Sequence, residues 1–254
     1  MKQGTLCMKT TLVRGIAAFF AVIAATLTAA PAAHARIIGT DLEVILGRDT
    51  AAALEQKYGL YRNKQEQERI ERMGKQMVAV SGRTALNYHF GILDTGEINA
   101  LAVPGGWVYT TRGLMEQHVT NDELAFVMGH EVAHIAHRDG VKQLEQGLGL
   151  SLAFGLIFDR SKTTQALVSD LLQLLLVRGY SRDDERDADL AAVDYARVTG
   201  YDPEGGVDFL QRLQKVGKSN PSALDRWFAT HPPINERIAT IEEKIRSAQK
   251  SRTH

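Results

Sequence analysis

Apolar side chains between residues 49 and 80 recur every three or four positions, which is the spacing of a helix with one buried face. The segment is rich in Ala, Leu, Glu, Gln, Lys and Arg, which favour helices. Gly59 interrupts it, so we predict one long helix or two broken near this glycine, within an N-terminal helical segment of about residues 41–80. The apolar positions of this segment are Tyr58, Leu60, Ile70, Met73 and Met77.

Three short segments that follow have the composition and alternation of strands. We expect strands from Leu86 to Leu93, from Ile98 to Val103 and from Trp107 to Thr110. Only Pro104-Gly105-Gly106, a turn signal, separates the second from the third. This spacing predicts a small, largely antiparallel sheet.

From residue 121 onward the apolar pattern is helical. Asn121 is suited to cap a first helix, and the negative charges of Asp122 and Glu123 favour its first turn through the helix dipole. Gly140 follows His137 at the place where this helix is expected to end. The apolar positions in between are Leu124, Val127, Met128, Val132, Ile135 and Ala136.

Two apolar runs come after this helix, from Leu148 to Phe158 and from Ala166 to Val177. Both are shorter than the roughly 20 residues that a membrane-spanning helix needs. We interpret them as core or lid helices. The alternative is a surface that rests on a membrane or on apolar substrates.

The remainder of the chain has the pattern of three further helices. Ser181 begins one that runs through Thr199 and ends at Gly200, and two more run from Glu204 to Val216 and from Ile234 to Ile245. Strands early in the chain and helices later predict an α+β fold that is predominantly helical.

The first 35 residues differ from the rest of the chain. Basic residues precede an apolar stretch at residues 16–30, and Ala33-His34-Ala35 follows as a cleavage pattern of the A-x-A type. This order is typical of a secretory signal peptide, whereas the alternative, a short membrane anchor, is disfavoured by the length of the stretch. We expect residues 1–35 to be removed and residues 36–254 to form the mature domain.

Composition and charge narrow the possible functions. Of the 254 residues, 44% are apolar and 24% are charged, which is typical of a soluble globular protein with one substantial core. No long basic run is present, so nucleic-acid binding is not expected. The single cysteine, Cys7, lies in the predicted signal peptide, so the mature domain has no thiol for a disulfide, a metal site or a nucleophile.

The strongest chemical signal is the stretch His130-Glu131-Val132-Ala133-His134. Positions four apart lie on one face of a helix, so both imidazoles can reach one ion. Zinc binds neutral histidine nitrogen and, in catalytic sites, keeps one position open for water. Glu131 adjoins the first histidine and is placed to act as general base on that water. We therefore predict a zinc site that holds one ion per chain.

A third ligand has to come from elsewhere. His137 is near the same helix face, but one straight helix cannot readily place three ligands around one ion, so we interpret it as a helix-end residue or a partner of a ligand. Glu185 is the preferred candidate, because it lies on a helix with an apolar face. Asp189 shares its face, so one carboxylate can bind the metal while the other accepts a hydrogen bond from a ligand histidine.

Four stretches resemble, in the same order, the HtpX/BepA-like zinc metallopeptidases, which are CAAX prenyl endopeptidase-type gluzincins, and most closely their short periplasmic members. The stretches are Ile98 to Ala102 followed by Pro104-Gly105-Gly106, Asp122 to Arg138, Tyr180 to Asp189, and Thr230-His231-Pro232-Pro233 with Arg237-Ile238. The resemblance covers nearly the whole mature chain. It implies a zincin-like metalloprotease domain with an active-site helix.

The resemblance also implies a role for each matching residue. His130, His134 and Glu185 match the zinc ligands of the family, and Glu131 matches its general base. Asp189 matches an aspartate that supports a ligand histidine and is sometimes given a proton-donor role.

Four further residues have roles that depend on the same resemblance. Asn99 and Ala100 fall on the strand expected to pair with an extended substrate. His231 matches a histidine near the metal, and we hypothesise that it either stabilises the oxyanion or caps the zinc as a removable fourth ligand. Arg237 is placed to assist, although an exposed helix arginine is an equal alternative.

These expectations describe a periplasmic zinc endopeptidase that hydrolyses unfolded or extended envelope proteins in protein quality control. Its partners are protein or peptide substrates, and association with a membrane surface or with outer-membrane proteins is a further expectation. A second hypothesis is a latent protease that acts mainly as a binding or assembly factor for outer-membrane proteins. A non-peptidase zinc hydrolase is disfavoured, because nothing in the sequence indicates a small-molecule pocket.

Overall fold

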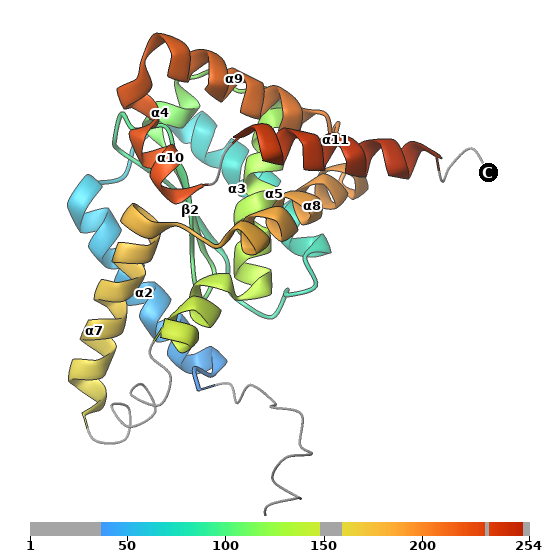
Figure 1. Cartoon of the computed structure of the whole chain (residues 1–254). Helices are drawn as coiled ribbons and strands as arrows, with labels where there is room; N and C mark the ends of the chain where they lie inside the picture. Colours follow the sequence, from blue (N-terminus) through green and yellow to red (C-terminus); the bar gives the residue numbers. More distant parts are fainter. Residues whose placement is uncertain (1–36, 148–158, 232–233, 251–254) are drawn as a thin grey trace, which may run out of the picture. The chain divides into compact units, whose positions relative to one another are not determined.

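A computed structural model describes residues 37–147, 159–231 and 234–250 (Figure 1). The expected signal peptide and the apolar run from Leu148 to Phe158 lie outside the described residues. The main helices are α2 (Thr40–Tyr58), α3 (Lys64–Val80), α4 (Arg112–Met115), α5 (Asn121–His137), α7 (Arg160–Gln173), α8 (Arg182–Val198), α9 (Gly205–Ser219), α10 (Asp225–Thr230) and α11 (Ile234–Lys250). Two shorter helical turns are the π-helix η1 (Leu174–Arg178) and the 3-10 helix η2 (Pro221–Leu224).

The predicted break at Gly59 separates two helices, as the sequence indicates. Gly59 follows the last residue of α2 and has a φ of 73°, a conformation that glycine adopts at little cost. The α3 helix then begins with its own cap, because the Asn63 side chain accepts a hydrogen bond from the backbone of Glu66.

The sheet has three strands in the order β1 (His89–Leu93), β3 (Trp107–Thr111) and β2 (Ala100–Val103). The expectation of a largely antiparallel sheet is correct for β2 and β3 but wrong for β1, which pairs with β3 in parallel. A tight turn accounts for the antiparallel pairing of β2 with β3. Gly105 and Gly106 have φ angles of 82° and 117°, which lets the chain reverse direction between the two strands. The parallel pairing with β1 then makes β3 the central strand.

The boundaries of α5 differ from the prediction at both ends. Thr120, and not Asn121, is the N-terminal cap, and Glu123 completes a capping box with it. At the other end Arg138 takes a left-handed φ of 64° and stops the helix. Gly140 lies within the next helical stretch, residues 139–147, and does not end α5.

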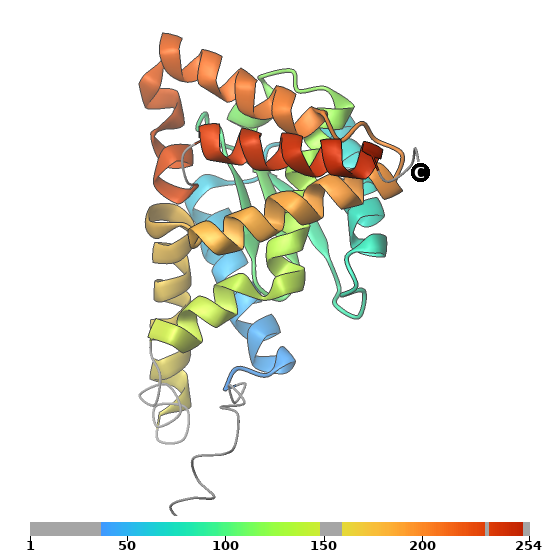
Figure 2. The same ribbon diagram turned by 45° about the vertical axis from the view of Figure 1, so that its right-hand side comes forward.

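Helix α8 begins and ends where the sequence predicts. Ser181 caps it in a capping box with Asp184, and Gly200 follows its end with a φ of 87°. The α8 helix lies between α5 and α11 (Figure 2). Gly129 allows α5 to approach α8 closely, because a side chain there would press on the backbone of Ala192.

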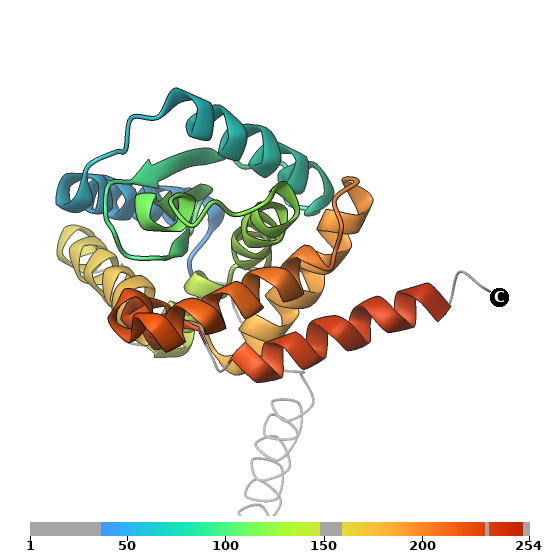
Figure 3. The same ribbon diagram turned by 90° about the horizontal axis from the view of Figure 1, so that it is seen from above.

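The core lies around α5. In the view from above, α3 lies on one side of α5, and α8 and then α11 lie on the other (Figure 3). The largest buried cluster joins apolar side chains of α3, the sheet, α5, α8, α9 and α11. The middle of α5 is buried all round, so the predicted metal-binding histidines come from a helix that its neighbours hold rigidly.

The second apolar run, from Ala166 to Val177, lies in α7 and η1. The α7 helix lies beside α2 (Figure 1). Leu167, Leu171 and Leu174 pack in a second buried cluster against Leu42 and Leu46 of α2. The interpretation of this run as a core helix is therefore confirmed. Among the described residues, none of the helices has the length and apolar character needed to cross a membrane.

Candidate metal centre

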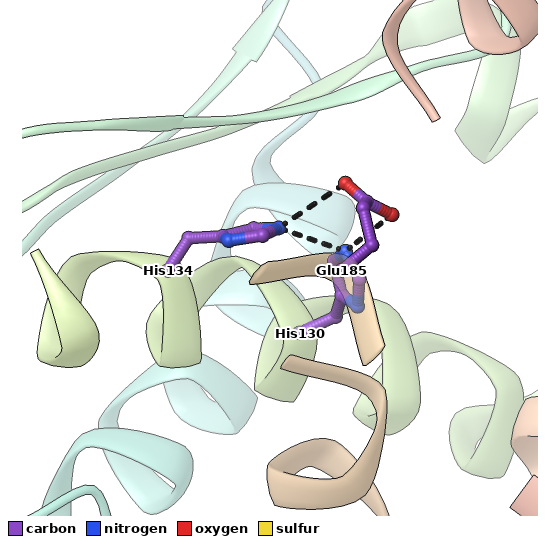
Figure 4. A group of neighbouring side chains, drawn as sticks. All are labelled: His130, His134 and Glu185. Atoms are coloured by element: carbon purple, nitrogen blue, oxygen red, sulfur yellow. Dashed lines mark hydrogen bonds and ion pairs between the residues drawn. The ribbon is translucent and has the colours of Figure 1, made fainter. Parts of the chain in front are cut away.

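Helices α5 and α8 bring three of the predicted residues together at one point (Figure 4). The candidate ligand atoms of His130, His134 and Glu185 all lie within 4.8 Å of one another. Nε2 of His130 is 3.0 Å from Nε2 of His134. The Glu185 carboxylate places Oε1 3.4 Å from Nε2 of His134 and Oε2 3.6 Å from Nε2 of His130. All three residues are at most 1% exposed.

Local sequence explains why these side chains converge. His130 and His134 are one helical turn apart, so their rings share the face of α5 that is turned to α8. Glu185 lies in the first turn of α8, just after the Ser181 cap, where the helix dipole favours a negative charge.

A carboxylate holds the outer nitrogen of each histidine ring. Nδ1 of His130 lies 3.0 Å from Oδ1 of Asp189, and Nδ1 of His134 lies 2.9 Å from Oδ2 of Asp139. Such a partner fixes the orientation of a ligand histidine and leaves Nε2 facing the centre. Asp189 is where the sequence predicts it. Asp139 was not predicted as a functional residue, and its only sequence signal is its place five residues after His134.

Arg237 is buried in the centre, so the alternative of an exposed helix arginine is wrong. Its side chain is 4% exposed. Nε and Nη2 of its guanidinium lie 2.8 and 2.6 Å from the two carboxylate oxygens of Asp189, and Nη1 lies 3.3 Å from Oε2 of Glu185. Arg237 therefore links Asp189, the carboxylate that contacts Nδ1 of His130, to Glu185, the third candidate ligand.

His231 contacts the centre through Glu185. Its Nδ1 lies 2.8 and 2.9 Å from the two carboxylate oxygens, and the ring packs at 4.2 Å on the indole of Trp227. A carboxylate only accepts hydrogen bonds, so Nδ1 is the donor. His231 lies outside the group of three convergent ligand atoms.

The electrostatics of the centre favour an anionic Glu185. Burial raises the pKa of this carboxyl, but its electrostatic interactions with His231, Arg237 and His130 outweigh burial and hold the pKa well below its usual value. Burial lowers the pKa of His134, yet the hydrogen bonds that its ring donates to the carboxylates of Asp139 and Glu185 raise it to about 10. The surrounding carboxylates thus favour positive charge at this point, and a zinc ion would supply that charge in place of the histidine protons, because the ligand form of histidine is the neutral ring.

The donor set fits a zinc ion. Two imidazole nitrogens and one carboxylate oxygen are the ligands that zinc takes in catalytic sites, where a fourth position stays open. Oε1 of Glu131 is buried and has no hydrogen-bond partner among the described residues. Buried polar atoms normally have a hydrogen-bond partner, and a water molecule at the open position of the metal would supply one for this oxygen. His137, by contrast, is one-third exposed and lies 3.9 Å from Asp139, consistent with a helix-end residue.

Of the remaining predicted residues, Asn99 directly precedes β2 and Ala100 is the first residue of that strand. Both are buried, and β2 is an edge strand of the sheet. Tyr180 joins this strand to the centre, because its hydroxyl donates to the carbonyl of Ala102 at 2.9 Å and its ring stacks on His134 at 3.9 Å. No role was predicted for Tyr180 from the sequence, although it begins one of the four stretches that carry the family resemblance.

The fold and the centre define the class of protein. A buried helix with His, Glu and His at this spacing, closed by a glutamate of a second helix, is the arrangement of a metallopeptidase. Comparison with known families then specifies which one: the model of peptidase family M48 matches residues 64–245, and the chain belongs to this family. The resemblance to HtpX/BepA-like metallopeptidases is confirmed.

Curated relatives agree with this assignment. Mitochondrial metalloendopeptidase OMA1 of Schizosaccharomyces pombe is 27% identical over 183 residues, which are 72% of this chain and 54% of that protein. Metalloprotease YcaL of Escherichia coli is 26% identical, with 71% of this chain and 70% of that protein covered. Beta-barrel assembly-enhancing protease of Escherichia coli is 26% identical, with 69% and 38% covered. The chain thus spans about half of the length of the first relative, and all three relatives are named as proteases, two of them as metal-dependent ones.

Proposed function

We propose that this protein is a zinc-dependent endopeptidase that cleaves unfolded or extended proteins of the cell envelope. The observation that carries the proposal is the convergence of His130, His134 and Glu185 beside Glu131, whose buried Oε1 has no hydrogen-bond partner among the described residues. The predicted signal peptide and the similarity to Beta-barrel assembly-enhancing protease support a periplasmic location.

In this proposal His130, His134 and Glu185 hold the metal. Zinc bound there would polarise the scissile carbonyl and lower the pKa of the attacking water. The chain's own residues supply the proton transfers. Glu131 takes the proton of the water at its unpaired carboxylate oxygen and delivers it to the leaving amine.

Asp189 and Arg237 position the centre. Asp189 orients the His130 ring through Nδ1, and the paired hydrogen bonds from Arg237 fix the aspartate in turn. An arginine that binds a carboxylate with two nitrogens restricts its rotation more than a single bond does. The aspartate is thus better placed for orienting a ligand than for donating a proton, since Arg237 stabilises its ionised form and keeps its pKa low despite the opposing effect of burial.

The substrate class follows from the edge strand. Asn99 precedes β2 and Ala100 is its first residue, and an extended peptide can add to such an edge strand through main-chain hydrogen bonds. Most extended segments of a folded protein are already paired within its own sheets, so unfolded envelope proteins, including outer-membrane proteins, are the proposed substrates. A latent enzyme that binds such proteins without cleaving them is the second candidate, and it is favoured by the contact of His231 with Glu185.

Digestion of casein and of an unfolded outer-membrane protein tests the proposed function. The protein lacking residues 1–35 is expected to cleave both, to lose at least about 100-fold in rate after complete chelation and to recover with zinc. Equal activity before and after metal removal, verified by elemental analysis, would contradict a metal-dependent mechanism. Binding of both proteins without cleavage, in a zinc-loaded sample, would favour the latent enzyme.

Replacement of His231 by Ala is expected to raise the peptidase rate several-fold. Because Nδ1 donates to Glu185, the neutral ring presents a lone pair at Nε2, which suits a removable metal ligand better than an oxyanion donor. Initial rates on an extended fluorogenic peptide measure the effect, with zinc content as the control. A large loss at full zinc content would instead assign oxyanion stabilisation, and an unchanged rate would exclude both roles.

A further inference from the structure

Among the described residues, the β2 strand pairs with β3 on one side only, so its other side is an edge of the sheet. Leu101 lies opposite Tyr109 of β3, and the carbonyl of Asn99 accepts a hydrogen bond from the backbone of Thr111. In an antiparallel pair, alternate residues direct their backbone groups to the partner strand. Residues 99 and 101 therefore face β3, and the backbone groups of Ala100 and Ala102 face away from it, toward the free edge of the sheet.

Tyr180 occupies one of these two outward positions. Its hydroxyl donates to the carbonyl of Ala102 at 2.9 Å. Its ring lies between that strand and the metal centre, stacked on the imidazole of His134 with an angle of 21° between the planes. The tyrosine hydroxyl thus competes for the carbonyl that the backbone N–H of an added strand would use.

The chain around Tyr180 holds this hydroxyl in place. Gly179 has a φ of 70°, and its N–H closes the π-helical turn η1 on the carbonyl of Leu174. A side chain at Gly179 would clash with the backbone of Thr230, so η1 is packed against the residue before His231. On the other side Ser181 caps α8. Tyr180 is therefore fixed between two helical elements and is not part of a free loop.

We propose that Tyr180 determines substrate specificity by limiting how far an extended substrate pairs with β2. Ala100 offers its outward backbone groups to the substrate, and the carbonyl of Ala102 is taken by the tyrosine hydroxyl. Strand addition then stops short of Ala102, and substrate side chains beyond that point contribute little to binding. This inference rests on the proposed peptidase function and adds the residue that sets the extent of the substrate site.

The test measures peptide binding, so that it does not depend on hydrolysis. Fluorescent extended peptides are titrated into zinc-loaded Glu131→Gln protein with and without Tyr180→Phe, which keeps the stacked ring and removes the donor. We expect binding to tighten about 3- to 10-fold in the Phe variant, the range of one net hydrogen bond. Tyr201→Phe is the matched control, because its hydroxyl bonds to Gln76 on α3, and no change is expected.

An N-methyl scan of the peptide identifies the hydrogen bond itself. One backbone position should become sensitive to N-methylation only in the Tyr180→Phe protein, since only there is the carbonyl of Ala102 free to accept. The proposal would be overturned if the Tyr180→Phe protein bound the peptides no more tightly, or less tightly, than the protein with Tyr180. It would also be overturned if binding tightened without the new sensitivity to N-methylation, or if neither protein bound the peptides. The proposed peptidase function is tested separately, because it fails only if zinc-loaded protein that retains Glu131 does not hydrolyse peptides.

Discussion

Glu131→Gln is expected to lower the rate of peptide hydrolysis by about 10³-fold while leaving the zinc content unchanged. Glutamine has the same shape as glutamate but cannot accept and return a proton, and a positioned general base contributes roughly 10²–10⁴-fold to a rate. Oε1 of Glu131 is buried and has no hydrogen-bond partner among the described residues, so little structural support is lost with the charge. Steady-state kinetics on a fluorogenic peptide, with metal analysis of the same sample, measures the effect.

Glu123→Gln is a suitable control for this substitution. Glu123 is buried on the same helix, but its carboxylate pairs with Arg212 and with the backbone of Thr120, away from the metal centre. We expect the control to lower the melting temperature and to keep the rate per folded molecule. Retention of more than about a tenth of the activity by Glu131→Gln would show that another group takes the proton.

Local signals in the sequence predict most of the helices. Gly59 and Ser181 mark a helix boundary because their effect is on the backbone of their own turn, through a positive φ in one case and a side-chain cap in the other. Thr120 was missed as the cap of α5 because its neighbour Asn121 is an equally good capping residue. The pairing of β1 with β3 could not be predicted, since strand order depends on long-range packing and not on the spacing of neighbouring segments.

In the metal centre too, the residues that could be predicted from the sequence are those related by local structure. His130 and His134 are predictable because one helical turn relates them, whatever the rest of the fold does. Glu185 and Asp189 were candidates because they share a face of a helix with an apolar side, and the resemblance to a family then specified which of them binds the metal. Asp139 and Tyr180 escaped prediction, because each acts through a contact with His134 that exists only after α5 ends at Arg138 and η1 meets β2. The burial of Arg237 likewise depends on how α11 packs on α8.

Glu185→Ala is expected to weaken zinc binding by more than about 100-fold and to abolish peptidase activity at limiting zinc. Loss of a residue that only supports a ligand typically costs 10- to 100-fold in affinity, and loss of a ligand should cost more. The carboxylate is 0% exposed and lies within 3.6 Å of both histidine rings, so a water molecule cannot easily replace it in the same geometry. Competition with a chromophoric chelator measures the affinity.

The same variant separates metal binding from folding. Removing the carboxylate leaves Arg237 paired only with Asp189 and leaves His231 without its acceptor, so the metal-free protein should also become less stable. Glu123→Ala, which removes a buried carboxylate from Arg212, is expected to lose stability and keep its zinc. Tight zinc binding by a folded Glu185→Ala protein would exclude the glutamate as a ligand. The centre would then depend on the two histidines of α5 and on a third group that has yet to be located.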